Sequence, residues 1–125
     1  NDFDDAEVAE IGSKQHRVVL TRDRRLLRRK IIIHGYFVRA VMPKEQIAEI
    51  IRRFDLADST EPFTRCINCN GALASVAKPE IIDRLKPMTR AHYDEFKICR
   101  DCEQIYWRGS HYQRALTFIE ALGKQ

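Results

Sequence analysis

Apolar residues in the first part of the chain follow two spacings, one typical of helices and one typical of buried strands. In residues 43–56, isoleucines and a phenylalanine recur every three or four positions behind Pro43, which predicts a helix. Residues 17–21 form a short β-branched apolar run bounded by charge. That pattern predicts a strand of a parallel sheet, buried on both faces.

The segments around this strand complete the pattern. Residues 5–15 have apolar side chains at roughly helical spacing, with Asp5 at the N-cap position and an end expected near Gly12. Residues 24–30 predict a turn or a short helix, and residues 31–40 a broken strand region that bends at its glycine. The order helix, strand, short strand, helix is typical of an α/β fold.

The second part of the chain is organised differently. A helical stretch, residues 78–87, lies between two prolines, and residues 104–107 predict a strand. A final helix is expected between Ser110 as its N-cap and Gly123 as its C-cap. Its apolar stripe consists of Ala115, Leu116, Phe118, Ile119 and Leu122.

A chain of 125 residues has room for one compact domain or for a small core with an appended module. The change of pattern predicts a partial α/β core in residues 1–57 and a four-cysteine module with a C-terminal helix in residues 58–125. No run of 18 apolar residues is present, so no membrane span is expected. The acidic start does not resemble a signal peptide, and we expect a cytoplasmic protein.

Four cysteines form two closely spaced pairs. Cys66 and Cys69 make up the first pair, and Cys99 and Cys102 follow after 29 intervening residues. A two-residue gap allows one tight turn to direct both sulfurs at the same point, which predicts a tetrahedral Zn²⁺ site. Four protein ligands leave no position for a substrate, so this zinc is expected to be structural. Two disulfides are the alternative.

The net charge of +4 comes from one segment. Residues 17–30 carry seven basic residues and one acid, whereas the rest of the chain is slightly acidic. Such a patch is typical of a phosphate-binding surface. The alternative is a solvated arginine-rich helix face without a specific ligand.

Two aspartates are candidate ligands of a second cation. Asp23 follows the predicted strand by two residues, where ligands gather in parallel α/β sheets, and Asp5 begins the helix that leads into the same strand. Two such carboxylates could hold Mg²⁺ or Mn²⁺ with water completing the shell. Arg22, Arg24 and Arg25 would attract a nucleic-acid backbone to this site. Alternatively, Asp5 only caps its helix, and Asp23 caps the next turn or pairs with a neighbouring arginine.

The segment IYWRGSHYQR, residues 105–114, joins the last predicted strand to the last helix. Trp107 is expected in the core beneath the cysteine module rather than as a platform for base stacking. His111 at a helix start is more often a surface or capping residue than a catalyst. These residue patterns alone indicate a zinc-containing α/β protein that contacts nucleic acid.

The run DAEVAEIGSKQHRVVLTRD, the two cysteine pairs and the segment YWRGSHY together resemble the RNase domain at the C-terminus of Mut-seven type exonucleases. The resemblance covers nearly the whole chain and implies a PIN-like parallel-sheet core followed by a zinc ribbon and a final helix. It implies that Asp23 closes the central strand of the metal site and that Asp5 opens the preceding helix. We further expect Arg108, Ser110 and His111 to contact phosphate at the helix N-terminus.

Members of this family begin with a strand that carries an aspartate, followed by an arginine-rich helix, and neither precedes Asn1 here. The resemblance therefore implies an N-terminally incomplete sheet, which a missing N-terminal segment or a partner chain would complete.

The leading hypothesis is a metal-dependent ribonuclease domain that hydrolyses RNA phosphodiester bonds, in which this chain alone is inactive if the first strand is needed. The first alternative is a non-catalytic RNA-binding or ribosome-associated zinc-ribbon module. The second is a protein-interaction domain that a partner's strand completes.

Overall fold

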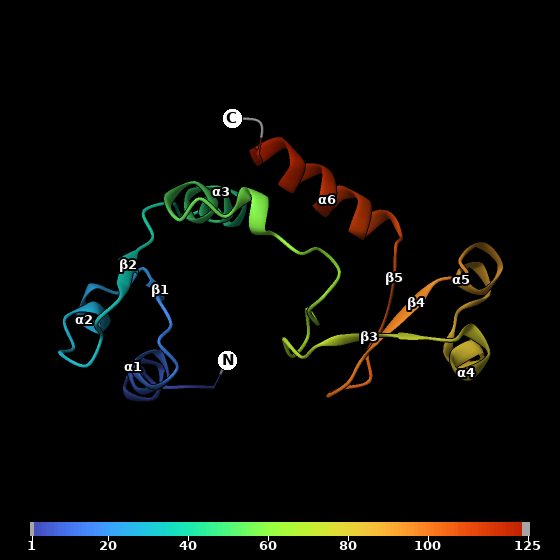
Figure 1. Ribbon diagram of the computed structural model, residues 1–125, viewed down its shortest axis with the longest axis horizontal. Coiled ribbons are helices and arrows are strands. Elements are labelled where there is room, and N and C mark those ends of the chain that lie inside the picture. Colours follow the sequence, from blue (N-terminus) through green and yellow to red (C-terminus); the bar gives the residue numbers. More distant parts are fainter. Residues whose placement is uncertain (1, 124–125) are drawn as a thin grey trace. The chain divides into compact units, whose positions relative to one another are not determined.

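A computed structural model describes residues 2–123 of the chain. The chain divides into two compact units, which we call unit 1 (Asn1–Leu56) and unit 2 (Ala57–Gln125). Unit 1 contains a small parallel sheet, and unit 2 contains a three-stranded antiparallel sheet and the C-terminal helix (Figure 1). The α/β class expected from the sequence is confirmed. None of the helices within residues 2–123 is long and apolar enough to cross a bilayer.

The first helix, α1 (Asp5–Lys14), begins with a capping box. The Asp4 side chain accepts a hydrogen bond from the Glu7 backbone at 2.8 Å, and the Glu7 side chain accepts one from the Asp4 backbone at 2.8 Å. The prediction that Asp5 is the N-cap is therefore wrong by one residue. Asp4 takes that position because the glutamate that closes the box lies three residues after it.

The same helix continues past Gly12 to Lys14, further than the sequence predicts. Gly12 is buried, and a Cβ atom placed on it would lie 2.7 Å from Cγ2 of Val19. Gly12 therefore serves the close packing of α1 on the first strand and does not end the helix. Ala9, Val19 and Leu26 form the buried cluster of unit 1, with Val8 and Ile32 packed against it.

The parallel sheet of unit 1 consists of β1 (Val19–Thr21) and β2 (Gly35–Phe37). The short helix α2 (Arg24–Leu27) lies between them in sequence, as predicted. Gly35 is not at a bend but is the first residue of β2, paired with Val19. A Cβ at this position would lie 2.6 Å from Cδ2 of Leu27, so glycine allows α2 to pack closely on the strand.

The last helix of unit 1, α3 (Pro43–Arg53), has proline in its first turn and buries Ala48 and Ile51. Its existence and its proline start are confirmed. The ring of Phe54, which follows the helix, contacts the Tyr36 ring edge-on at a centroid distance of 5.5 Å. These contacts attach α3 to β2.

The residues that follow β2 are held from two sides by charged side chains. The Arg22 guanidinium donates to the backbone carbonyls of Val38 and Arg39 at 2.7 and 2.6 Å, and to that of Ala40 at 3.2 Å. The Glu49 carboxylate accepts from the Arg39 amide at 2.9 Å and from the Ala40 amide at 2.8 Å. These bonds satisfy backbone groups that no strand partner reaches.

Unit 2 is an antiparallel meander in the order β3-β4-β5, with helical segments before β3, between β3 and β4, and after β5 (Figure 1). A 3₁₀ turn, η1, opens the unit, and α4, η2 and α5 lie between β3 and β4. The bounds are η1 (Ala57–Ser59), β3 (Leu73–Val76), α4 (Lys78–Ile81), η2 (Ile82–Arg84), α5 (Pro87–His92), β4 (Phe96–Cys99), β5 (Ile105–Trp107) and α6 (Ser110–Gly123).

The core of unit 2 consists of Ile81, Leu85, Phe96 and Ile105, with Val76, Tyr93 and Trp107 packed against it.

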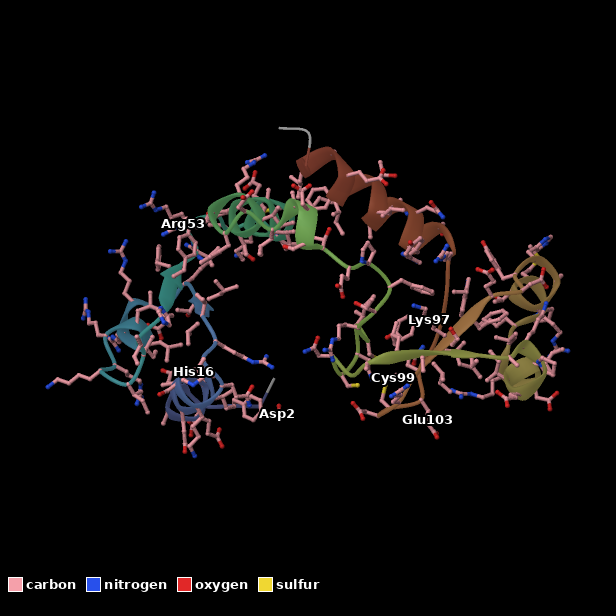
Figure 2. The ribbon with its side chains drawn as sticks, viewed as in Figure 1. Asp2, His16, Arg53, Lys97, Cys99 and Glu103 are labelled. Carbon is pink, nitrogen blue, oxygen red and sulfur yellow. The ribbon has the colours of Figure 1, made fainter. Side chains whose placement is uncertain are left out.

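A lysine of β4 holds the segment before the cysteines in place. Lys97, labelled in Figure 2, donates from Nζ to the Phe63 carbonyl at 2.8 Å and lies 4.9 Å from the centroid of the Phe63 ring. The Lys97 ammonium group thus combines a hydrogen bond with a cation–π contact, and both attach Phe63 to β4.

The final helix is confirmed, but its two predicted caps are not. The helix begins at Ser110 itself and includes Gly123 as its last residue, so neither lies in the flanking cap position. Ser110 accepts hydrogen bonds from the Arg114 side chain through both its carbonyl and its hydroxyl. The hydroxyl thus has a partner on the next helical turn.

Replacement of Glu49 tests how unit 1 is held together. The amide of Arg39, followed by the Ala40 amide and the Tyr36 hydroxyl, keeps the pKa of Glu49 below its ordinary value of 4.5. A lowered pKa in the folded state adds stability above pH 4.5, and this stability is lost as pH falls through the folded value. Glu49→Gln should therefore lower the urea midpoint at pH 7, and its difference from the wild type should persist down to about pH 4.5 and shrink below it.

Glu45→Gln is the matched control for this measurement, because it removes the same charge from an exposed position in the first turn of the same helix. Equal losses of stability in the two variants, or a Glu49→Gln difference that persists in acid, would contradict the assigned role.

Candidate functional site

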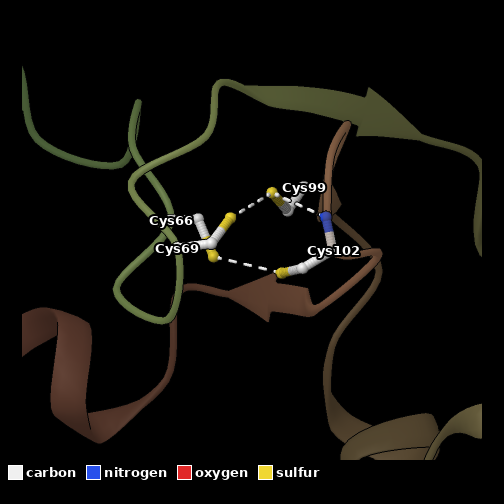
Figure 3. A group of neighbouring side chains, drawn as sticks. All are labelled: Cys66, Cys69, Cys99 and Cys102. Carbon is white, nitrogen blue, oxygen red and sulfur yellow. Dashed lines mark hydrogen bonds between the residues drawn. The ribbon is translucent and has the colours of Figure 1, made fainter. Parts of the chain in front are cut away.

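The four cysteines lie on two tight turns of unit 2 whose side chains point toward one another (Figure 3). Cys66 and Cys69 belong to the turn before β3, Cys99 is the last residue of β4, and Cys102 lies in the turn that leads to β5. Cys66 and Cys99 are buried, whereas Cys69 and Cys102 are exposed. Each pair therefore contributes one buried and one exposed cysteine.

The two turns have matching backbone geometry. The residue after each second cysteine, Asn70 or Glu103, has a positive φ of 66° or 63°. The Asn70 amide donates to the Cys66 carbonyl at 2.8 Å, and the Glu103 amide donates to the Cys99 carbonyl at 3.1 Å. Glutamate rarely adopts this left-handed conformation, so the turn must be held by its surroundings.

A glycine allows the two turns to approach each other. A Cβ on Gly71 would lie 2.4 Å from Oδ2 of Asp101 and 2.9 Å from Sγ of Cys99. A larger residue at position 71 would push the second turn away from the first. Gly71 therefore contributes to the convergence of the four sulfurs.

The distances between the sulfurs fit a tetrahedral ion. All four lie within 4.8 Å of one another, with Cys66 and Cys102 3.5 Å apart and Cys69 and Cys99 3.4 Å apart. A tetrahedral site with Zn–S bonds of about 2.3 Å requires sulfurs separated by roughly 3.8 Å. All four cysteines are free, so the alternative of two disulfides is not what the structure contains. The cluster is consistent with a structural zinc site.

Tyr106 contacts this cluster from β5. The Tyr106 oxygen accepts a hydrogen bond from the Ile67 amide at 3.0 Å, and the hydroxyl is also hydrogen-bonded to Sγ of Cys66 at 3.0 Å. When Cys66 is a thiolate, the hydroxyl is the donor of this second bond. Burial alone raises the pKa of Cys66, but the bonds from Tyr106 and from nearby backbone amides outweigh burial and lower this pKa to about 6. The thiolate needed for metal binding is therefore favoured at Cys66.

In unit 1 the predicted basic residues are used in different ways. Arg22 is bound to three backbone carbonyls, a structural role that the sequence did not indicate. The Arg24 guanidinium lies 4.6 Å from the centroid of the Phe37 ring. The Arg25 side chain is exposed, while its backbone amide donates to Asp23 at 2.8 Å. All three arginines are exposed, and the predicted contact of Arg22, Arg24 and Arg25 with RNA stays a prediction.

Asp23 is the N-cap of α2, as the structural alternative proposed. Its amide donates to the Thr21 hydroxyl at 2.9 Å, and its Oδ1 accepts from the Arg25 amide. Asp5 is exposed in the first turn of α1. Within residues 2–123, the cysteine cluster is the only group of three or more metal-ligating residues close enough to share an ion. The roles of Asp5 and Asp23 as cation ligands stay predictions.

The segment after β5 is mainly structural. Trp107 packs against Phe96 and Tyr93 at centroid distances of 6.2 and 6.3 Å, so its predicted place in the core is confirmed. A Cβ on Gly109 would lie 2.9 Å from Nε1 of Trp107, which explains the glycine between the tryptophan and the helix.

Two residues of this segment remain at the surface. The Arg108 guanidinium lies 5.7 Å from the ring centroids of both Phe63 and Tyr112. His111 is exposed and lines a largely apolar cavity of about 240 Å³ together with Tyr112 and Trp107. That Arg108 and His111 bind phosphate stays a prediction.

Three contributors were missed by sequence reasoning. Glu49 and Tyr106 act on groups that lie at least nine residues away along the chain, and no local pattern indicates such pairings. Arg39 lines the same surface groove as Arg24 although it lies on a different segment. Only the position of Tyr106 between the last cysteine pair and the tryptophan could have drawn attention to it.

Together these features define a small α/β protein with a four-cysteine cluster on an antiparallel sheet and an arginine-rich parallel unit. The family model of the Mut7-C RNase domain matches residues 1–119, and the chain belongs to this family. The resemblance noted in the sequence is thereby confirmed, and membership implies ribonuclease activity with RNA as the substrate. No curated protein and no solved structure was found to match the chain.

The Tyr106 hydroxyl offers a test of the cysteine cluster. Tyr106→Phe removes the bond to Cys66 and leaves the Ile67 amide without its acceptor. Loss of such a supporting bond typically costs on the order of 10–100-fold in metal affinity. We expect a decrease of this size in zinc affinity, measured by competition with a chromophoric chelator. Tyr93→Phe, which alters a tyrosine packed on Trp107, should leave the affinity unchanged.

Proposed function

We propose that this chain belongs to a metal-dependent ribonuclease that hydrolyses RNA phosphodiester bonds with the help of Mg²⁺ or Mn²⁺. The observation that carries this proposal is the position of Asp23 in a chain of the Mut7-C RNase domain family. Asp23 is exposed, and it lies two residues beyond Thr21, the last residue of β1. Ligands of open parallel sheets gather at this carboxyl edge.

The surroundings of Asp23 are compatible with cation binding. Thr21 and Arg25 hold the backbone and Oδ1 of Asp23, so its carboxylate has a defined orientation. An ionised carboxylate has about four lone-pair sites, and one hydrogen bond leaves capacity for a cation. Asp5, in the first turn of the helix that precedes β1, is the second proposed ligand.

A third acid is expected from outside this sequence. Residues 2–123 contain no group of three acids placed to share an ion, and two carboxylates with water form a minimal Mg²⁺ site. Val18 and Leu20, at β1, are 41% and 44% exposed. Apolar side chains at this exposure support a further strand, either from a preceding segment or from a partner chain, that covers β1 and supplies the acid.

Different side chains of this chain would bind the cation and the RNA. Asp5 and Asp23 would bind the cation, while Arg24 and Arg25 would attract the RNA backbone through their charge. Arg108 and His111 of unit 2 are proposed as additional phosphate contacts. A bound Mg²⁺ or Mn²⁺ supplies charge neutralisation at the phosphodiester and activation of a water nucleophile.

Zinc is proposed to act structurally at Cys66, Cys69, Cys99 and Cys102. Four cysteine ligands leave no open coordination position, so the zinc site would take no part in hydrolysis. Free thiols in a chain of this kind favour a reducing compartment, and we propose the cytoplasm.

Replacement of Asp23 by asparagine tests the catalytic proposal without disturbing the fold. Asparagine caps helices about as well as aspartate, so Asp23→Asn should preserve the start of α2 while it removes the cation-binding charge. In the natural full-length protein, we expect this variant to lose manganese-dependent cleavage of single-stranded RNA. The assay follows the products on a gel, and circular dichroism checks the fold.

Asp4→Asn is the matched control, because it makes the same change at the N-cap of α1. It should retain the cleavage activity, whereas Asp5→Asn at the next position should reduce it. Full activity in Asp23→Asn would refute the site. If neither Mg²⁺ nor Mn²⁺ stimulates cleavage but RNA still binds, the chain would instead be the non-catalytic RNA-binding module.

A further inference from the structure

Unit 1 contains a basic surface groove that joins Arg24 and Arg28 of the predicted basic patch to Arg39 from another segment. The groove has a volume of about 620 Å³ and is lined by Arg24, Leu27, Arg28, Gly35, Tyr36, Phe37 and Arg39. Every charged side chain of this lining is an arginine. Such a surface attracts a ligand with several negative charges.

One side of the groove comes from α2 and the residue after it. Arg24 and Arg28 are four positions apart, and Leu27 lies between them on the same helical face. Side chains with this spacing are neighbours, with Cβ atoms on the order of 5–6 Å apart. The two guanidinium groups can therefore contact adjacent anionic groups of one ligand.

The strand β2 supplies the floor. Gly35 has no side chain and leaves its part of the strand accessible, while the Phe37 ring supports the Arg24 guanidinium at 4.6 Å. A cation held over an aromatic face is positioned before a ligand arrives, which reduces the entropy that binding would otherwise cost.

The opposite side comes from Arg39, beyond the end of β2. Its backbone is fixed, because its amide donates to Glu49 at 2.9 Å and its carbonyl accepts from Arg22 at 2.6 Å. The side chain itself is exposed. Two segments of the chain thus contribute three arginines to one groove.

We propose that this groove binds two or three consecutive phosphates of a single-stranded RNA and leads the strand to Asp23, the residue next to Arg24. This inference rests on the proposed function for the identity of the ligand. It deepens that function by naming a strand-binding subsite and the three arginines that form it.

The dimensions of the groove favour a single strand over a duplex. Seven residues line it, whereas double-stranded RNA is typically recognised by shape over about 16 base pairs. A groove of this size admits a flexible strand whose phosphates can follow the arginines. Contacts to phosphate carry no sequence information, so a subsite that holds the strand through its phosphates should show little sequence preference.

The arginine segment itself provides a matched control. Arg29 and Lys30 belong to this segment and are exposed, but neither lines the groove. Arg24→Ala with Arg28→Ala and Arg29→Ala with Lys30→Ala remove the same formal charge from the same short segment. A difference between the two double variants therefore reports on the groove and not on the general field of the patch.

The experiment measures binding of a fluorescent oligouridine to the full chain by anisotropy, without added Mg²⁺ or Mn²⁺, over a series of salt concentrations. Each phosphate contact to a single strand contributes about 0.7 to the slope of log K against log salt. Arg24→Ala with Arg28→Ala should lower the slope by about 1.4 and weaken binding at low salt. The control double variant should stay near the wild type.

A second groove variant, Arg28→Ala with Arg39→Ala, leaves the Arg24–Phe37 contact intact and should give the same loss. It keeps the test valid if replacement of Arg24 disturbs folding. An RNA duplex of the same length should compete poorly with the oligouridine. Equal effects of the groove and control variants, or stronger binding of the duplex, would overturn the inference.

Failure of this inference can be distinguished from failure of the proposed function. If Asp23→Asn abolishes cleavage but the groove variants bind RNA normally, the nuclease site stands and the subsite is wrong. If Asp23→Asn cleaves RNA normally while the groove variants lose binding, the subsite stands and the assigned site of hydrolysis is wrong.

Discussion

Convergence of four sulfur atoms on one point is the constraint on which unit 2 depends. Its buried apolar cluster is small, and a unit of this size rarely has enough core to be stable without a metal or a covalent link. The two cysteine turns join the segment before β3 to the ends of β4 and β5. Gly71 permits the close approach, and Tyr106 orients Cys66 within it.

In unit 1, charged side chains instead of cysteines hold a backbone segment in place. Its parallel sheet has only two short strands, and the chain beyond β2 has no further strand to pair with within the described residues. Arg22 satisfies carbonyls of that segment and Glu49 satisfies amides of it. The segment that carries Arg39 is thereby given a defined path. The charged side chains of Arg22 and Glu49 therefore have a structural role, because they hold the backbone of this segment in place.

The different roles of the arginines change the interpretation of the basic patch in residues 17–30. Of the arginines around Asp23, Arg22 is bound to backbone carbonyls, whereas Arg24 is held by Phe37 at the edge of a groove. Membership of the Mut7-C RNase domain family gives such a groove a reason to exist, because a ribonuclease must bind a polyanion. Backbone-directed binding by arginines meets that requirement.

The sequence by itself determined the elements with strong local signals: the helix behind Pro43, the strand before Asp23, the metal-like spacing of the cysteines and the core position of Trp107. A local pattern also indicates which aspartate caps α1, because Asp4 stands three residues before Glu7 at the spacing of a capping box, but the sequence analysis placed the cap at Asp5. Only the tertiary structure showed the roles of Arg22, Glu49 and Tyr106 and the groove shared by Arg24 and Arg39. Their partners lie many residues away, and distance along the chain carries no signal until folding brings the groups together.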